Sequence, residues 1–109
     1  MKYEIEITAK AKSDIRGIYD YIALELLAPE TAANQLDRLE KSISGLGFMP
    51  SRFRKYGSEQ WQSRGLRIMP VDNFAVLYIP DRKTKIVTII RVMYGGRDIE
   101  KQLDSMQQS

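Results

Sequence analysis

Three side chains capable of acid–base or phosphate chemistry crowd a short stretch near the end of the chain. Arg91, Tyr94 and Arg97 flank a Gly-Gly break, where a strand rich in β-branched residues (86–94) ends and a helix-like tail begins. A strand end that meets a loop can bring such side chains together. The chain has no His and no Cys, so any catalysis would have to use Arg, Lys, Tyr or carboxylates. The same absence excludes disulfides, Cys- or His-ligated metals and Ser-His-Asp machinery.

Positive charge is concentrated in one half of the chain. The formal net charge is +3, yet residues 52–97 carry ten Lys and Arg against three Asp and Glu, a net of +7. Such a half attracts phosphates or an acidic partner segment, and a solvated face without a ligand is the alternative. Within it Arg52, Arg54 and Lys55 could grip nucleic acid together with the aromatic Trp61, or could lie on a solvated loop. Trp61 could equally anchor this loop on the core.

Length and composition indicate one globular domain spanning residues 1–109. A chain of 109 residues can bury one modest core, and 43% hydrophobic with 28% charged residues argues against disorder. No apolar run approaches the roughly 20 residues that span a bilayer. No signal peptide is visible in the sequence. We therefore expect a cytoplasmic protein without a membrane partner.

Hydrophobic periodicity predicts a strand and two helices in the first half. Residues 3–7 alternate apolar and acidic side chains, as a half-buried strand does. Thr8 is placed to cap a helix that runs to about Leu26. Pro29 suits the first turn of a second helix, which Gly45 and Gly47 end. Two amphipathic helices with so short a connection should fold back as an antiparallel hairpin.

The second half predicts a basic loop, three strands and a short helix. Residues 50–64 lack clear periodicity, whereas residues 66–69, 74–79 and 86–94 have strand character. The short joints between the strands favour an antiparallel meander. A final helix is expected from about Asp98. We expect an α+β fold, with an N-terminal strand, a helical hairpin on one face of a mostly antiparallel four-stranded sheet, and a short C-terminal helix.

This order of elements, together with the run from Ile89 to Leu103, resembles the RelE/ParE superfamily of toxins from type II toxin–antitoxin systems. Typical members read roughly Arg-Val-x-His-Gly-x-Arg-Asp there, and this chain reads Arg-Val-Met-Tyr-Gly-Gly-Arg-Asp. The likeness extends to residues 14–22 of the first helix and to residues 73–78 of a strand. It covers nearly the whole chain, and the C-terminal run slightly favours the ParE-like branch.

The RelE branch of this resemblance implies a ribosome-dependent endoribonuclease that cuts messenger RNA. Such a nuclease stabilises the charge that develops on phosphorus as a ribose 2′-hydroxyl attacks. Its catalytic candidates would be Arg67, Arg91, Tyr94 and Arg97. Three positions depart from that pattern, because Ala75 replaces a common Arg, Met69 a frequent Lys or Arg, and Tyr94 a frequent His.

The ParE-like branch implies a non-enzymatic toxin that binds and poisons DNA gyrase. This function tolerates the lack of His and the Ala at position 75, and we favour it. A third alternative is an inactive relict that binds only an antitoxin. The resemblance implies a cognate antitoxin with an acidic, amphipathic segment, and promoter DNA bound only through that antitoxin. No cofactor or metal is expected.

Candidates for target or antitoxin binding lie on the basic loop and around the Gly-Gly break: Arg52, Arg54, Lys55, Trp61, Arg91, Arg97 and Asp98. Structural alternatives stand beside them. Arg91 is expected on the strand face of Val87, Ile89 and Met93, where it could be an edge charge. Tyr94 is expected on the face of Ile90 and Val92 as a core-rim residue. Arg97 could pair with Asp98, Glu100 or Glu25, and Gly95 and Gly96 are expected to allow positive φ.

Overall fold

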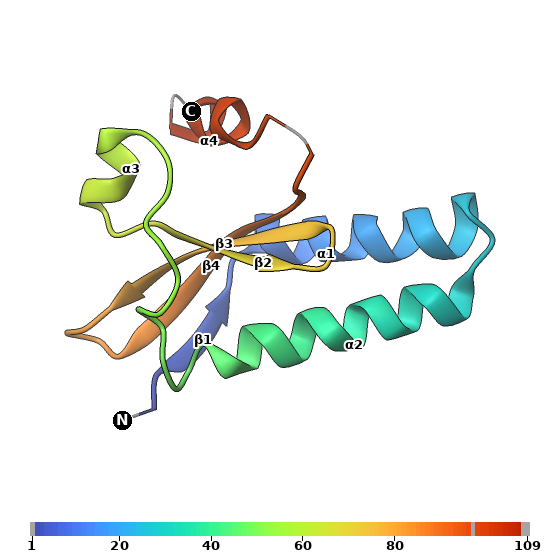
Figure 1. Cartoon of the computed structure of the whole chain (residues 1–109), viewed down its shortest axis with the longest axis horizontal. Coiled ribbons are helices and arrows are strands. Elements are labelled where there is room, and N and C mark those ends of the chain that lie inside the picture. The colour runs from blue at the N-terminus through green and yellow to red at the C-terminus, as the bar shows by residue number, and fades with distance from the viewer. Residues whose placement is uncertain (1, 97, 108–109) are drawn as a thin grey trace.

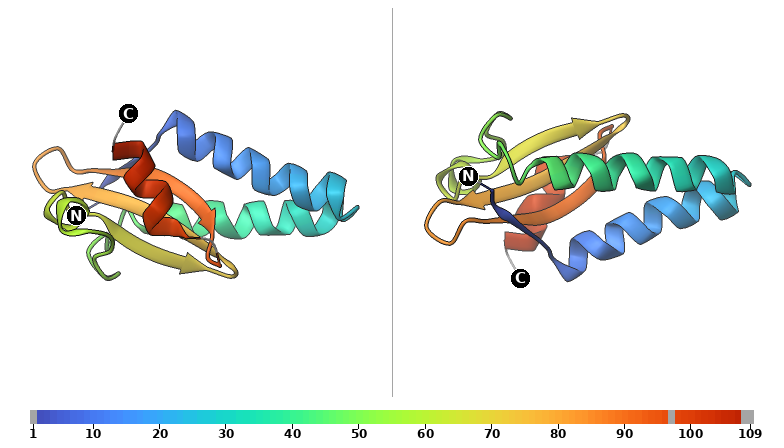
Figure 2. Two further views of the ribbon diagram at one scale, coloured as in Figure 1. Left: turned by 90° about the horizontal axis from the view of Figure 1, so that it is seen from above. Right: turned by 90° about the horizontal axis from the view of Figure 1, so that it is seen from below.

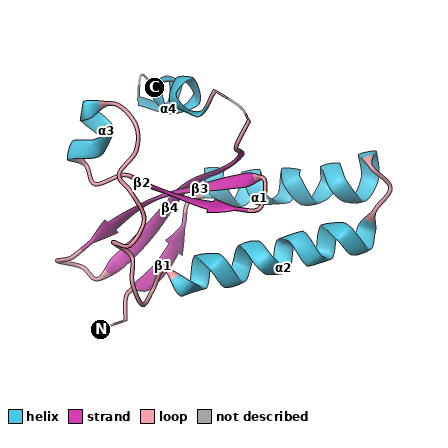
Figure 3. Cartoon of the chain, in the orientation of Figure 1, coloured by secondary structure: helices cyan, strands magenta, loops and turns pink. Residues whose placement is uncertain are grey.

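The computed structural model describes residues 2–96 and 98–107 and contains the predicted α+β fold (Figure 1). Figure 3 shows the strands gathered at one end and two long helices that project beyond them. The elements in chain order are β1 (Glu4–Ile7), α1 (Ala9–Asp20), the π-helical turn η1 (Tyr21–Glu25), α2 (Pro29–Gly45), α3 (Glu59–Ser63), β2 (Arg67–Val71), β3 (Phe74–Asp81), β4 (Ile86–Tyr94) and α4 (Ile99–Gln107).

The helical hairpin begins and turns at the residues that its sequence predicts. The Thr8 hydroxyl accepts a hydrogen bond from the Ala11 backbone N–H at 3.1 Å and caps α1. The first helix ends near the predicted Leu26, although its last residues form η1 rather than regular α-helix. Leu27 then adopts a positive φ of 52°, and Pro29 starts α2. The turn therefore sits at the far tip of the hairpin.

The four strands form one sheet in the order β1-β4-β3-β2. The pairs β2–β3 and β3–β4 are antiparallel, as the short joints predict, and β1 lies parallel to β4. A parallel neighbour requires a crossover, and the helical hairpin supplies it. Since β1 ends at Ile7 opposite Ile89, the second half of β4 has no strand beside it on that edge.

Helices cover both faces of the sheet, and the hairpin lies on one of them as predicted. Leu39 and Ile43 of α2 pack with Val76 of β3 on that face, while Trp61 of α3 and Leu103 of α4 pack on the other. The two views of Figure 2 place α4 and the hairpin on opposite sides of the strands. The expected loop at residues 50–64 contains α3, because Trp61 is almost fully buried and holds one helical turn against the sheet.

A β-bulge corrects the expected orientation of the C-terminal strand. Arg91 lies opposite Leu77, but the next pair is Tyr78 with Ile89, which leaves Ile90 as an extra residue. One extra residue reverses the alternation of side chains. Ile89 therefore packs in the cluster under the hairpin, whereas Ile90 packs against the cluster under α3 and α4. The bulge separates Arg91 from Val87 and Ile89, with which it was expected to share a face, and leaves it on the side of Met93. Tyr94 keeps the predicted side of Val92 but not that of Ile90.

Candidate functional site

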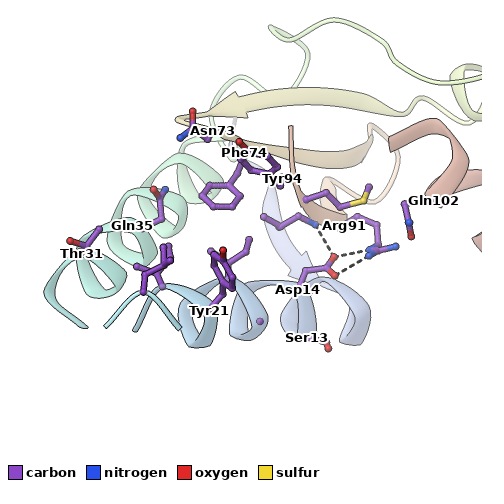
Figure 4. A pocket seen from close by; sticks show the side chains of 16 residues that line it. Ser13, Asp14, Tyr21, Thr31, Gln35, Asn73, Phe74, Arg91, Tyr94 and Gln102 are labelled. Carbon is purple, nitrogen blue, oxygen red and sulfur yellow. Dashed lines mark hydrogen bonds and ion pairs between the residues drawn. The ribbon is translucent and has the colours of Figure 1, made fainter. Parts of the chain in front are cut away.

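A groove of about 890 Å³ separates the helical hairpin from the end of the sheet. In Figure 4 the helical side chains lie along one wall, and Phe74 and Tyr94 lie along the other. The residues that line the groove include Asp14, Tyr21, Gln35, Phe74, Arg91 and Tyr94. The groove is therefore built from segments that are far apart in the sequence and meet only in the fold.

Arg91 and Asp14 close one end of this groove as a buried ion pair. Arg91 Nε donates to Asp14 Oδ2 at 2.7 Å and Nη2 donates to Oδ1 at 3.0 Å. The two side chains are only 9% and 12% exposed. Asp14 Oδ2 also accepts the Val92 backbone N–H at 3.0 Å. The Asp14 carboxylate thus accepts a β4 backbone hydrogen bond that a neighbouring strand would otherwise accept. The Arg91 guanidinium is bound to the same carboxylate.

Tyr94 stands at the open rim of the groove. Its ring meets Phe74 edge-on with centroids 6.0 Å apart, and the residue remains 52% exposed. Gly96 lies directly beside it, since a Cβ there would approach Tyr94 Cε1 to 3.0 Å. Neither Gly95 nor Gly96 has a positive φ, so that expectation was wrong. A Cβ at position 96 would therefore require the Tyr94 ring to shift by a few tenths of an ångström.

The tip of the hairpin carries exposed apolar side chains, which we call the apolar tip: Tyr21, Leu24, Leu26 and Leu27. Leu24 is 69% exposed and Leu27 is 83% exposed. Tyr21 and Leu26 also line the groove, so the two features are continuous. A contiguous apolar surface of this kind marks an interaction site more often than scattered single residues do.

A polar cluster ties the opposite wall of the groove to the sheet. Asp72 Oδ2 accepts hydrogen bonds from Arg38 Nε at 2.7 Å and from Gln35 Nε2 at 3.0 Å. These hydrogen bonds, that from Arg38 first, lower the pKa of Asp72 below its ordinary value. Sequence reasoning missed this cluster. The available signal was Gln35, a polar residue next to the apolar stripe of α2. Its side chain is buried in the fold, with Gln35 only 7% exposed.

The family of the chain follows from comparison with known proteins. The model of the ParE toxin of type II toxin–antitoxin systems matches residues 5–99. The chain belongs to the ParE toxin family. It is therefore a toxin of a type II toxin–antitoxin system within the RelE/ParE superfamily. No curated protein sequence matches it.

Solved structures share the fold of this ParE-family chain at low sequence identity. The chromosomal ParDE system of P. aeruginosa aligns with a TM-score of 0.66 and 22% identity, covering 85% of this chain and 96% of the other. The RelBE2 complex of Mycobacterium tuberculosis gives 0.61 and 20%, covering 86% and 99%. A mutant of the E. coli toxin RelE in the free state gives 0.68 and 11%, covering 98% of both chains.

The candidate catalytic residues do not converge in this ParE-family fold. Arg67 pairs with Tyr78 in the middle of β3, whereas Tyr94 pairs with Phe74, the first residue of that strand. These two positions of β3 are four residues apart, which is about 13 Å along the strand. Arg67 Nη1 donates to the Phe53 carbonyl, and Arg91 is bound to Asp14. Arg97 lies outside the described residues.

Two of the three positions that depart from the nuclease pattern, Ala75 and Met69, are buried on opposite faces of the sheet. Ala75 is 4% exposed in the cluster that Ile99 and Leu103 of α4 complete. Met69 is 2% exposed in the cluster under the hairpin. Both positions contribute to packing, and apolar side chains of α4 cover the sheet around Ala75.

The structure divides the candidate binding residues into exposed and buried ones. Arg52, Arg54 and Lys55 are exposed. Trp61 is 3% exposed, so its ring is a core anchor. Asp98 is exposed, and its Oδ1 accepts the Lys101 backbone N–H at 3.1 Å, which caps α4.

Two classes of site are not found in the described part of the chain. Residues 2–96 and 98–107 contain no group of three or more Asp or Glu placed to hold a metal ion. None of the helices within these ranges is both long and apolar enough to cross a membrane.

Proposed function

We propose that this ParE-family toxin stops growth by binding DNA gyrase in the cytoplasm and trapping it with broken DNA. The observation that carries the proposal is the apolar tip, which projects from the sheet and is continuous with the groove. Burial of one exposed leucine side chain in a partner is worth about 1.5–3 kcal/mol. A poison that acts by binding needs such a surface and needs no general base.

The arrangement of charged groups supports binding over RNA cleavage. A nuclease needs a base, an acid and cations around one phosphate. Here the guanidinium of Arg91 is committed to Asp14, and the β3 residues that pair with Arg67 and Tyr94 are about 13 Å apart along the strand. Among the described residues, these side chains form no common site.

A cognate antitoxin is the second partner that we propose. One structural relative, RelBE2 of Mycobacterium tuberculosis, is a toxin–antitoxin complex. The groove offers apolar walls to an amphipathic segment, and the basic half of the chain would attract acidic residues in that segment. An antitoxin that fills this groove would also reach the apolar tip and could block contact with gyrase. Promoter DNA would then be bound through the antitoxin.

Parallel assays on the purified chain test the proposal. The chain should inhibit plasmid supercoiling by gyrase and should leave messenger RNA intact on translating ribosomes. Messenger cuts with normal supercoiling would replace the proposal with the endoribonuclease. Inactivity in both assays, with a folded chain that still binds its antitoxin, would identify a relict.

A further inference from the structure

Five basic residues gather along the outer edge of the sheet, a surface that we call the cationic edge: Arg52, Arg54, Lys55, Arg64 and Arg67. The backbone of Lys55 pairs with that of Arg67, the first residue of β2, in an isolated antiparallel β-bridge. Backbone hydrogen bonds from Tyr56 N–H to Leu66 O at 3.0 Å and from Ile68 N–H to Arg54 O at 3.1 Å hold the strands together. The chain between Arg52 and Arg67 thus folds back on itself along the edge of the sheet. Arg52 and Arg67 lie near Tyr78 of the cluster under the hairpin, and Arg54 and Arg64 lie over rings of the cluster under α3 and α4.

Aromatic rings hold three of these guanidinium groups in place. Arg52 Cζ lies 4.8 Å from the centroid of the Phe53 ring, and Arg54 Cζ lies 5.3 Å from that of Tyr56. Arg64 Cζ lies 4.4 Å from the Trp61 ring. Stacking orients a guanidinium and leaves the N–H donors at its perimeter available to an anion. Three of the five cations of the cationic edge thus each lie over an aromatic ring.

Internal acids do not neutralise the cationic edge. The ion pairs found in the described residues join Arg38 to Asp72, Lys41 to Asp37 and Arg91 to Asp14. None of them includes a residue of the cationic edge. Burial, followed by the charges of Glu100 in α4 and of Asp98, raises the pKa of Tyr56, whose ring lies under Arg54. The cationic edge keeps a local excess of positive charge.

The chemistry of this surface favours phosphates over bases. Trp61 is 3% exposed, and the rings of Phe53 and Tyr56 are half-buried beneath arginines. No free ring in this cluster is offered to an unpaired base, although proteins that bind single strands depend on such stacking. Cations without an exposed stacking ring match the phosphate backbone of a duplex, where contacts carry no direct sequence information.

We propose that the cationic edge binds the phosphate backbone of duplex DNA directly. The choice of DNA over RNA rests on the proposed function, because gyrase acts on a DNA duplex. Contact between the toxin and that duplex would place the cationic edge on DNA while the apolar tip engages the enzyme.

Salt dependence and a matched pair of variants test this inference. Anisotropy of a labelled DNA duplex of mixed sequence would be measured against the whole chain over a range of salt concentrations. The variant R52Q/R54Q/K55Q should bind at least about 10-fold more weakly, and its log–log salt slope should fall by about 0.9 for each lost phosphate contact. The control K10Q/K12Q/R16Q removes the same charge from exposed positions of α1 and should stay within about 2-fold of the unmodified chain.

Several outcomes would overturn the assignment. Absence of binding by the unmodified, folded chain would do so, as would equal losses in the two variants, which would indicate attraction by net charge alone. Equal or tighter binding of duplex RNA would remove DNA as the ligand. Preferential binding of a polyglutamate peptide would assign the surface to an acidic protein partner. The anisotropy assay contains no gyrase, so its result is independent of the supercoiling assay. DNA binding without inhibition of supercoiling would contradict only the proposed function. Inhibition of supercoiling without DNA binding would contradict only this inference.

Discussion

The apolar tip and the cationic edge present opposite chemistry from opposite parts of one small domain. The apolar tip consists of leucines and a tyrosine, with Leu27 83% exposed. The cationic edge consists of arginines stacked on aromatic rings and a lysine. The helical hairpin holds one surface away from the sheet, and pairing along β2 fixes the other.

The two surfaces should respond differently to the salt concentration. Apolar burial is insensitive to moderate salt, whereas contact between cations and phosphates weakens steeply as salt rises. Substitutions in one surface should therefore leave the other unaffected. The following predictions use this independence, beginning with the change that would abolish both surfaces.

Loss of the buried ion pair should have the largest effect. Arg91→Ala would leave the Asp14 carboxylate, whose side chain is 12% exposed, without its cation. Breaking such a pair costs about 3–5 kcal/mol of unfolding free energy. We expect urea denaturation to show this loss, and both surfaces should fail together at temperatures where the unmodified chain is folded.

An exposed ion pair provides the control for that measurement. Lys41 and Asp37 lie one helical turn apart at 77% and 61% exposure. Lys41→Ala should therefore cost only about 0.3–0.5 kcal/mol. A similar small loss in the Arg91→Ala variant would show that the buried pair does not hold the hairpin to β4.

Charge on the apolar tip should separate the two surfaces. The variant L24D/L27D should weaken supercoiling inhibition by at least about 100-fold, because each of the two leucines contributes about 1.5–3 kcal/mol when it is buried in a partner. Its affinity for duplex DNA and its melting temperature should stay close to those of the unmodified chain. Asp tolerates the positive φ of Leu27. An unchanged inhibition curve would remove the apolar tip from the target interface.

Tyr78 anchors the segment that leads into the cationic edge. Its hydroxyl donates to the Pro50 carbonyl at 2.6 Å, and burial raises its pKa from 10.0 to about 12. The stabilisation from neutral Tyr78 is complete below the unfolded pKa of about 10 and is lost as pH rises through about 12. Tyr78→Phe should cost about 1 kcal/mol at neutral pH and should flatten this alkaline loss. Urea denaturation across that range checks both, and an identical pH profile in the variant would contradict them.

Asp72 should produce the smallest effect. Because hydrogen bonds from Arg38 and Gln35 lower its pKa, its stabilisation is present above the unfolded value of about 3.9 and is lost as pH falls through the folded one. The melting temperature of Asp72→Asn should therefore fall less steeply in acid than that of the unmodified chain. Asn retains the turn, where φ is 56°. Asp37→Asn is the surface control, and a matching change there would assign the effect to general charge.

Most elements were predictable because their causes are local. The cap at Thr8, the helix start at Pro29 and the strands of the second half depend on neighbours within a few residues. The bulge at Ile90 was not predictable, because a bulged strand has the same residue types as a regular one. The bulge nevertheless reverses the face of Arg91 relative to the first half of β4. The helix α3 was missed because a five-residue helix shows too little periodicity and is held by burial of Trp61.

The candidate site was predictable in its residue types but not in its partners. Arg91 stood out in the sequence, yet Asp14 is 77 residues away and meets it only because the hairpin returns along β4. The stacking of Arg52, Arg54 and Arg64 on aromatic rings depends on pairing beside β2. Contacts of this kind are set by tertiary packing, which the periodicity of a sequence does not reveal.

Accumulation of gyrase-cleaved plasmid is the most direct test of the central claim, that this chain is a gyrase poison acting through its apolar tip. Gyrase and plasmid would be incubated with the unmodified chain or with L24D/L27D, and DNA broken by gyrase would be quantified after denaturation of the enzyme. We predict that cleaved DNA accumulates with the unmodified chain and falls toward background with the folded variant. Background cleavage with the unmodified chain, or equal cleavage with both, would contradict the account.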